Sequence, residues 1–383
     1  MLGALCSFES LCLSGEDLVF RSMSAKMITM HRDSEQNVAE AQAENSRSRL
    51  HWRGLVQVAI GAGALAVVLI KIDARGLSDA IRSTRWGYLP FAVAAAFAVC
   101  WLMAYRWSAI LRVRGHQVET HRLFVYYLIG AFFTNFVPGG SASGDIARLV
   151  YVDREIRDKP FVLSTLIYER LVGVFTLLLI GLIATVSSRA FEEHARAIYL
   201  AEAVLGLGFI ASAMLMSDFV STRVARLIVS VGSRFGIERI SGAAARTLTA
   251  ISELRRHRAM LLRTVLVSIS VRLVWGLGCF AVAQALDLPL GLPTVFAFMS
   301  LVDLLRLMPL SVGGLGVREW LIIALFAGVG ISRERALTFS ILAFAPIYLT
   351  AITGGIIYVL TARIRRRDDR VSELELKRSE GLS

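Results

Sequence analysis

The sequence predicts an all-α protein, a polytopic bundle of transmembrane helices. Of the 383 residues, 55% are hydrophobic, and the mean hydropathy is +0.60. The apolar residues gather in long runs, and about 18 such residues are enough to cross a bilayer core. Within lipid every backbone group needs an internal partner, which leaves helices or a closed barrel. The runs are far longer than the roughly 10-residue alternating strands of a barrel, so helices are expected.

Seven to nine hydrophobic segments are expected, and they divide the chain into a membrane domain and two tails. The candidate segments are 54–72, 87–110, 122–138, 161–187, 199–216, 262–285, 293–310, 319–330 and 336–361. We expect a disordered cytoplasmic tail at 1–50, a transmembrane domain at 51–362 and a basic cytoplasmic tail at 363–383.

The basic residues lie between the apolar runs and predict the orientation of the chain. The net charge is +12, but no basic-aromatic domain is left once the helices are removed, so nucleic-acid binding is not expected. The stretch 217–261 holds eight arginines and three acidic residues, which favours the cytoplasm. We therefore expect both termini in the cytoplasm. The protein itself is expected in the cytoplasmic (inner) membrane. The loop 286–292, without Lys or Arg, is expected outside. The loop 73–86 must also lie outside, although it holds three arginines.

Counting crossings predicts two re-entrant segments. Only an even number of crossings can join the cytoplasmic loop at 111–122 to the cytoplasmic stretch at 217, yet three apolar runs lie between them. The shortest run is broken by Pro and Gly, so we expect 122–148 to dip into the membrane and return. Two short runs around 308–319 are either a second dip, from the outside, or two crossings. We favour an inverted pair of dips.

Two breaks in the apolar runs resemble each other. The first reads FVPGGSASGDIAR from Phe136 to Arg148, and the second reads MPLSVGGLGVRE from Met308 to Glu319. Pro removes a backbone donor, and Gly permits a close approach of another group. Matched broken segments in two halves indicate a site near the bilayer midplane of a transporter. The simpler alternative is a pair of tight turns at the membrane surface.

Charged residues within the apolar runs are costly, about 3 kcal/mol each at the bilayer centre, and therefore need a partner or water. They are either ion pairs that hold helices together or the walls of a polar cavity, and both can apply. Arg106 lies near the end of its run and is expected to extend to the membrane surface. The stretch 217–261 also has helical spacing of apolar residues, which fits either a helix on the membrane surface or a packed linker helix.

The sequence does not predict a metal ion or a cofactor. Its four cysteines have no close spacing, and no phosphate-binding glycine-rich motif is present, so ATP hydrolysis is not expected.

Several motifs together resemble one family. They are VPGGSASGDIAR, YERLVGVFTLLLIGL from Tyr168, MPLSVGGLGVREW and a later AL at Ala336 and Leu337. In this order they are similar to the lysylphosphatidylglycerol synthase transmembrane family, also called flippase-like or UPF0104 proteins. The resemblance covers roughly 54–360 and implies a bundle of about eight helices with re-entrant pieces. Its best-known members carry an aminoacyl transferase domain, which is not expected here because the chain ends about 20 residues after the last run. The family often has Glu at the position of Asp145 and Asp at the position of Glu169.

The resulting hypothesis is a lipid translocase for a phospholipid or an isoprenoid or hopanoid-type lipid. Membrane lipids are the expected partners, and a homo-oligomer or a separate lipid-modifying enzyme remains open. The rival hypotheses are a membrane-embedded transferase with Asp145 or Glu169 as general base, and a non-transporting scaffold. The expected cavity residues are Asn135, Pro138, Gly139, Gly140, Gly144, Asp145, Arg148, Glu169, Arg170, Arg272, Asp303, Arg306, Pro309, Gly313, Gly314, Gly316, Arg318 and Glu319.

Overall fold

The structure is a computed structural model that describes one unit of the chain. It covers residues 73–138, 140–188, 205–210, 257–307 and 314–380, with single positions at 63, 66, 203, 223 and 311. Outside the described residues lie the predictions for 1–50, for nearly all of 54–72, for most of 199–216 and 217–261, and for Gly139, Pro309 and Gly313.

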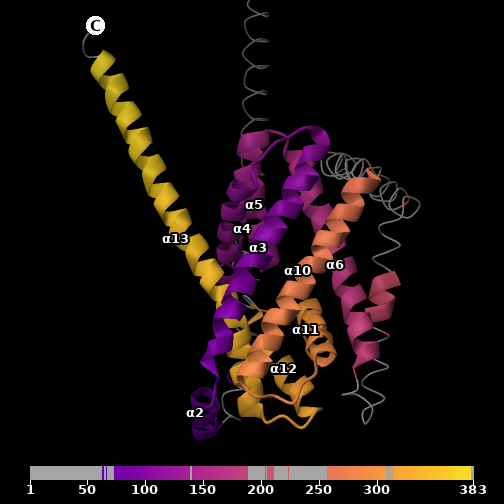
Figure 1. The fold of residues 1–383 in the computed structure, drawn as a ribbon. Helices are drawn as coiled ribbons and strands as arrows, with labels where there is room; N and C mark the ends of the chain where they lie inside the picture. Colours follow the sequence, from indigo (N-terminus) through magenta and orange to yellow (C-terminus); the bar gives the residue numbers. More distant parts are fainter. Residues whose placement is uncertain are drawn as a thin grey trace, which may run out of the picture. The chain divides into compact units, whose positions relative to one another are not determined.

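Every regular element in the described ranges is helical and none is a strand, which confirms the predicted class (Figure 1). The helices are α2 (Ala74–Arg82), η1 (Trp86–Tyr88), α3 (Leu89–Leu111), η2 (Arg112–Arg114), α4 (Thr120–Phe136), α5 (Ser141–Ile156), α6 (Lys159–Ser187), α10 (Arg258–Ala285), α11 (Leu292–Arg306), α12 (Val317–Ala327) and α13 (Arg333–Glu380). Helix α13 continues into the predicted tail at 363–383, which is therefore helical as far as Glu380.

Four helical stretches in the described part of the chain are long and apolar enough to cross a membrane. They are Trp86–Arg114, Lys159–Ser187, Arg258–Ala285 and Arg333–Thr361. Large apolar side chains on them face outward, among them Phe91, Ile183 and Leu262. Such outward apolar faces suit lipid better than water. The full number of segments stays a prediction, because the first and fifth predicted runs fall mostly outside the described residues.

Local sequence signals set the helix ends around the first break. Helix α6 begins after Asp158, whose carboxylate accepts a hydrogen bond from the Phe161 backbone N–H at 3.2 Å. Helix α4 ends at Phe136, because Val137 precedes Pro138 and adopts the extended backbone that a following proline favours. Gly140 then has a φ of +58°, a conformation that glycine adopts without a steric penalty.

Helices α4 and α5 form a tightly packed hairpin around the first break. Gly144 on α5 lies against the backbone of Gly130 on α4, and a Cβ at Gly144 would overlap the carbonyl of Gly130 and the hydroxyl of Thr134. Small residues of this kind let membrane helices approach closely. The predicted cavity residue Gly144 therefore packs the hairpin.

The hairpin begins and ends at one end of the bundle. Arg114, just before α4, pairs with Asp158, just after α5, at 3.1 Å. Arg122 in the first turn of α4 lies 3.8 Å from Glu155 in the last turn of α5. The chain thus leaves α5 beside the point where it entered α4.

The second break separates α11 from α12, which also pack on each other. The rings of Phe298 and Phe326 lie 5.7 Å apart between their centres. Nearby loops are joined as well, because the Arg85 backbone N–H donates to the Ala285 carbonyl at 2.8 Å and its guanidinium lies 3.4 Å from Asp287. The loop before α3 therefore lies beside the loop after α10, and these are the two loops that the sequence places on one side of the membrane.

Two hydrophobic clusters hold the described part of the bundle together. One is built mainly from α3, α4, α5 and α6 and includes Trp107 and Phe161. The other is built mainly from α10, α11, α12 and α13 and includes Phe298, Phe339 and Phe344. Helix α10 also packs along α3, and α13 packs along α4, so the two clusters are parts of one bundle.

Candidate functional site

A cavity of about 360 Å³ lies among seven of the helices. Its volume falls within the range typical of small-molecule sites. Residues of α3, α4, α5, α6, α10, α11 and α13 line it, together with Gly140 from the first break and Ser311 and Gly314 from the second. Both broken segments therefore reach the same cavity.

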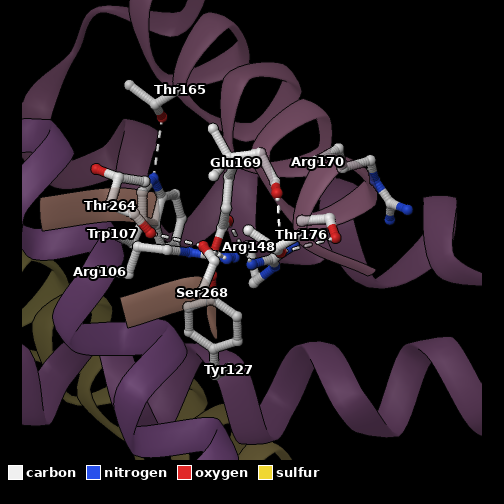
Figure 2. Close-up of polar contacts among 12 residues, drawn as sticks. Arg106, Trp107, Tyr127, Arg148, Thr165, Glu169, Arg170, Thr176, Thr264 and Ser268 are labelled. Carbon is white, nitrogen blue, oxygen red and sulfur yellow. Dashed lines mark hydrogen bonds and ion pairs between the residues drawn. The ribbon is translucent and has the colours of Figure 1, made fainter. Parts of the chain in front are cut away.

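Glu169 on α6 is the centre of the first charged cluster in this cavity (Figure 2). Its Oε1 accepts hydrogen bonds from the Arg106 guanidinium at 2.6 Å and from the Tyr127 hydroxyl, and its Oε2 accepts one from Arg148 at 3.2 Å. The carboxylate is 3% exposed, so removal from water without these three donors would be strongly unfavourable. Helices α3, α4 and α5 are joined to α6 through this one group.

Asp145 on α5 extends the cluster toward the first break. It accepts from Arg148 in its own helix and from Arg170 on α6, and Arg170 also donates to the Ser141 carbonyl at 3.1 Å. The Arg148 guanidinium carbon lies 4.3 Å from the centre of the Tyr127 ring, a cation–π contact. Arg148 is thus fixed between two carboxylates and an aromatic face.

Asp303 on α11 is the centre of a second charged cluster. Its two oxygens accept from Arg272 on α10 at 3.1 Å and from Arg306, one turn further along α11, at 3.4 Å. Arg272 also donates to the Gly173 carbonyl of α6 at 3.3 Å. All three charged side chains line the cavity.

The structure brings together ten of the predicted cavity residues as lining of this one cavity. They are Asn135, Gly140, Asp145, Arg148, Glu169, Arg170, Arg272, Asp303, Arg306 and Gly314. The described residues Pro138, Gly144, Gly316, Arg318 and Glu319 do not line it.

Arg318 and Glu319 are buried and bind each other at the start of α12. The Arg318 Nε donates to Glu319 at 2.9 Å, and Glu319 accepts the Gly316 backbone N–H at 2.6 Å. The Arg318 guanidinium lies over the Phe344 ring at 4.0 Å. Glu319 thereby satisfies one backbone N–H at the start of α12, so the charged residues after the two breaks have different surroundings.

Arg106 is a correction to the sequence prediction. It does not extend to the membrane surface: the residue is 4% exposed, pairs with Glu169 and donates to Ser268 on α10 at 2.7 Å. Nothing in the sequence links Arg106 to a carboxylate 63 positions away. Tyr127 and Ser268 also belong to the cluster and were not predicted, since a tyrosine or a serine in an apolar run carries no distinctive signal.

The described residues contain no group of three or more His, Cys, Asp or Glu side chains that could hold a metal ion. The carboxylates in the cavity are surrounded by arginines, which is a poor setting for a cation.

The fold and cavity define a multi-pass α-helical membrane protein with a buried, charged interior. The model of the lysylphosphatidylglycerol synthase TM region matches residues 54–355, so the chain belongs to that family. This finding confirms the resemblance carried by the two broken motifs.

Two relatives with known sequences support the same membership. The chain is 24% identical over 294 residues to a UPF0104 membrane protein of Methanothermobacter thermautotrophicus, covering 73% of this chain and 87% of the relative. It is 22% identical over 340 residues to a UPF0104 membrane protein of Pyrococcus horikoshii, covering 78% and 96% respectively. No solved structure matches the chain significantly.

Proposed function

We propose that this chain is a lipid translocase of the cytoplasmic membrane that takes a lipid head group into the charged cavity. The observation that carries the proposal is the position of this cavity. Helices α3, α6 and α10 and part of α13 bound it, and these belong to the four stretches that are long enough to cross a membrane. A polar interior surrounded by lipid-facing helices provides a path for a head group that hydrocarbon excludes. The lipid is a phospholipid or an isoprenoid or hopanoid-type lipid.

The proposed topology has two re-entrant hairpins that enter from opposite sides. The α4–α5 hairpin enters from the cytoplasmic side, because its two ends adjoin the arginine-rich loop at 112–114. The α11–α12 pair enters from the outer side, where the loop 286–292 lies beside the loop 73–86. Both termini are cytoplasmic in this arrangement. The tips of the hairpins then meet at the cavity, as in transporters built from inverted repeats.

The state of the carboxylates favours translocation over transferase chemistry. A general base needs a lone pair that is directed at a substrate proton. Glu169 is engaged by three donors, and Asp145 is engaged by two arginines. Both carboxylates therefore serve to position arginines in the cavity, and the arginines remain as the groups that meet a head group.

Reconstitution into liposomes tests the proposal. Vesicles with a fluorescent phospholipid would be exposed to a membrane-impermeant quencher, with the parent chain compared with Asp145→Asn and Arg148→Ala. We expect fast quenching of the inner-leaflet pool for the parent and slower quenching for both variants. Arg122→Gln, an exposed arginine outside the cavity lining, serves as the matched control. Equal rates for all four proteins, or rates no faster than empty vesicles, would contradict the proposal.

A further inference from the structure

The described lining of the cavity has an excess of positive charge. Five arginines and three carboxylates line it, which leaves two positive charges unbalanced. The excess is divided evenly. Around Glu169 and Asp145 there are three arginines, Arg106, Arg148 and Arg170, and around Asp303 there are two, Arg272 and Arg306. Each cluster therefore has one arginine more than it has carboxylates.

The residues of the two breaks that the structure leaves undescribed do not change this balance. Gly139 in the first break is uncharged, and so are the residues of the second break at 308–310 and 312–313. An uncompensated charge in a low-dielectric interior is unfavourable, so two positive charges in excess indicate that the resting cavity is set to receive negative charge.

Unpaired polar atoms on buried residues of the cavity wall are consistent with the same ligand chemistry. Three buried lining residues have a polar atom without a hydrogen-bond partner among the described residues: the Nε of Arg106, the Nε1 of Trp275 and the hydroxyl of Ser311. These residues are 4%, 9% and 5% exposed. The first two atoms can only donate, and the third can donate or accept. Two of the three atoms would therefore gain from an acceptor, which no described residue supplies.

We propose that the cavity is an anion site for a phosphate-bearing head group with two negative charges. This inference rests on the proposed function, since it names the class of head group that the translocase takes. A phosphate oxygen accepts several hydrogen bonds, and arginine guanidinium groups bind phosphate in a bidentate way. A phosphomonoester carries close to two negative charges at neutral pH, which balances the excess. A zwitterionic or cationic head group would leave the excess positive charge of the cavity unbalanced.

The extra arginine of each cluster can be removed without leaving a carboxylate unpaired, which allows a clean test of the charge balance. Arg170→Gln leaves Asp145 with Arg148, and Arg306→Gln leaves Asp303 with Arg272, so every carboxylate keeps one arginine. The double variant therefore removes the excess without creating an unpaired buried carboxylate. Arg122→Gln, exposed and outside the lining, removes the same type of charge elsewhere.

The experiment measures binding to the full chain in detergent by calorimetry with three probes. Lysophosphatidic acid carries the phosphomonoester and a tail. Lysophosphatidylcholine has the same backbone and tail with a zwitterionic head group, and inorganic phosphate has no tail. We expect lysophosphatidic acid to bind at least about tenfold more tightly than lysophosphatidylcholine, and each arginine variant to weaken it about tenfold. Arg122→Gln should bind like the parent.

Each outcome decides the inference. Equal affinity for the two lysolipids, or an unchanged affinity in the double variant, would overturn it. If the double variant does not fold, the two single variants carry the same comparison, one for each cluster. Inorganic phosphate that binds as tightly as lysophosphatidic acid would overturn the assignment to a lipid and leave a site for free phosphate.

The liposome assay separates this inference from the proposed function. Anion binding by a protein that moves no lipid would contradict the translocase and leave the anion site. Translocation at equal rates for fluorescent phosphatidic acid and phosphatidylcholine would contradict the anion preference and leave the translocase.

Discussion

Arg106 on α3 and Glu169 on α6 form a buried ion pair with a nitrogen–oxygen distance of 2.6 Å. The pair is 63 positions apart in the sequence and joins two helices that are each long enough to cross a membrane. Arg106 is fixed by Ser268 on its other side, so three such helices meet at one guanidinium group. The same pair forms part of the cavity wall, so the contact that holds these helices also shapes the site.

Neutralising this carboxylate tests how far the bundle depends on it. Glu169→Gln leaves Arg106 and Arg148 without their shared negative partner, and breaking a buried pair in this way costs about 3–5 kcal/mol. We expect a lower apparent melting temperature in detergent, measured by intrinsic fluorescence. Glu119→Gln removes an exposed carboxylate whose partners are also exposed, and it should change stability by less than about 1 kcal/mol. Similar melting temperatures for the two variants would contradict the role of Glu169.

The tight hairpin predicts that position 144 tolerates no side chain. Gly144→Ala places a Cβ against the Gly130 backbone and the Thr134 hydroxyl, so α4 and α5 must separate. We expect a loss of about 1–3 kcal/mol. Gly173→Ala is the matched control, because a Cβ at Gly173 meets nothing within 4 Å and a helical alanine is favoured over glycine. Melting curves of the two alanine variants should therefore move in opposite directions, and equal shifts would count against the close packing.

Much of the fold follows from the sequence because bilayer thickness sets the length of a crossing helix. The predicted runs at 87–110, 161–187, 262–285 and 336–361 each lie within one of the four long helical stretches of the structure. The first break was also predictable, since Pro138 and Gly140 act on the local backbone. Local chemistry was sufficient for these features.

The pairing of charges could not be predicted in the same way. Glu169 has three donors from three other helices, and no local pattern indicates which helices come together. The likeness of the two breaks also suggested equal roles for their charged residues. In the structure, Asp303 and Arg306 before the second break line the cavity, whereas Arg318 and Glu319 after it do not. Tertiary packing decides which charged side chains reach the cavity.

Cysteine labelling tests the proposed topology. Single cysteines would replace Arg114, Asp158, Arg85 and Asp287 in a background with the four native cysteines changed to serine. Because Arg114 pairs with Asp158 and Arg85 with Asp287, we expect the first two positions to react with a membrane-impermeant thiol reagent from the cytoplasmic face of vesicles and the other two from the opposite face. Right-side-out and inverted vesicles give the comparison. Reaction of positions 114 and 158 from opposite faces would mean that α4 and α5 cross the membrane an odd number of times.

The buried pair at the start of α12 should affect stability without affecting the ligand. Glu319→Gln removes the charge that Arg318 binds and weakens the acceptor for the Gly316 N–H, for a loss of about 2 kcal/mol. Neither Arg318 nor Glu319 lines the cavity, so lysophosphatidic acid should bind this variant as it binds the parent. Arg306→Gln provides the contrast, because it should weaken binding while Asp303 keeps Arg272 as its partner. If Glu319→Gln weakened binding as much as Arg306→Gln and left the melting temperature unchanged, the charges after both breaks would belong to the ligand site.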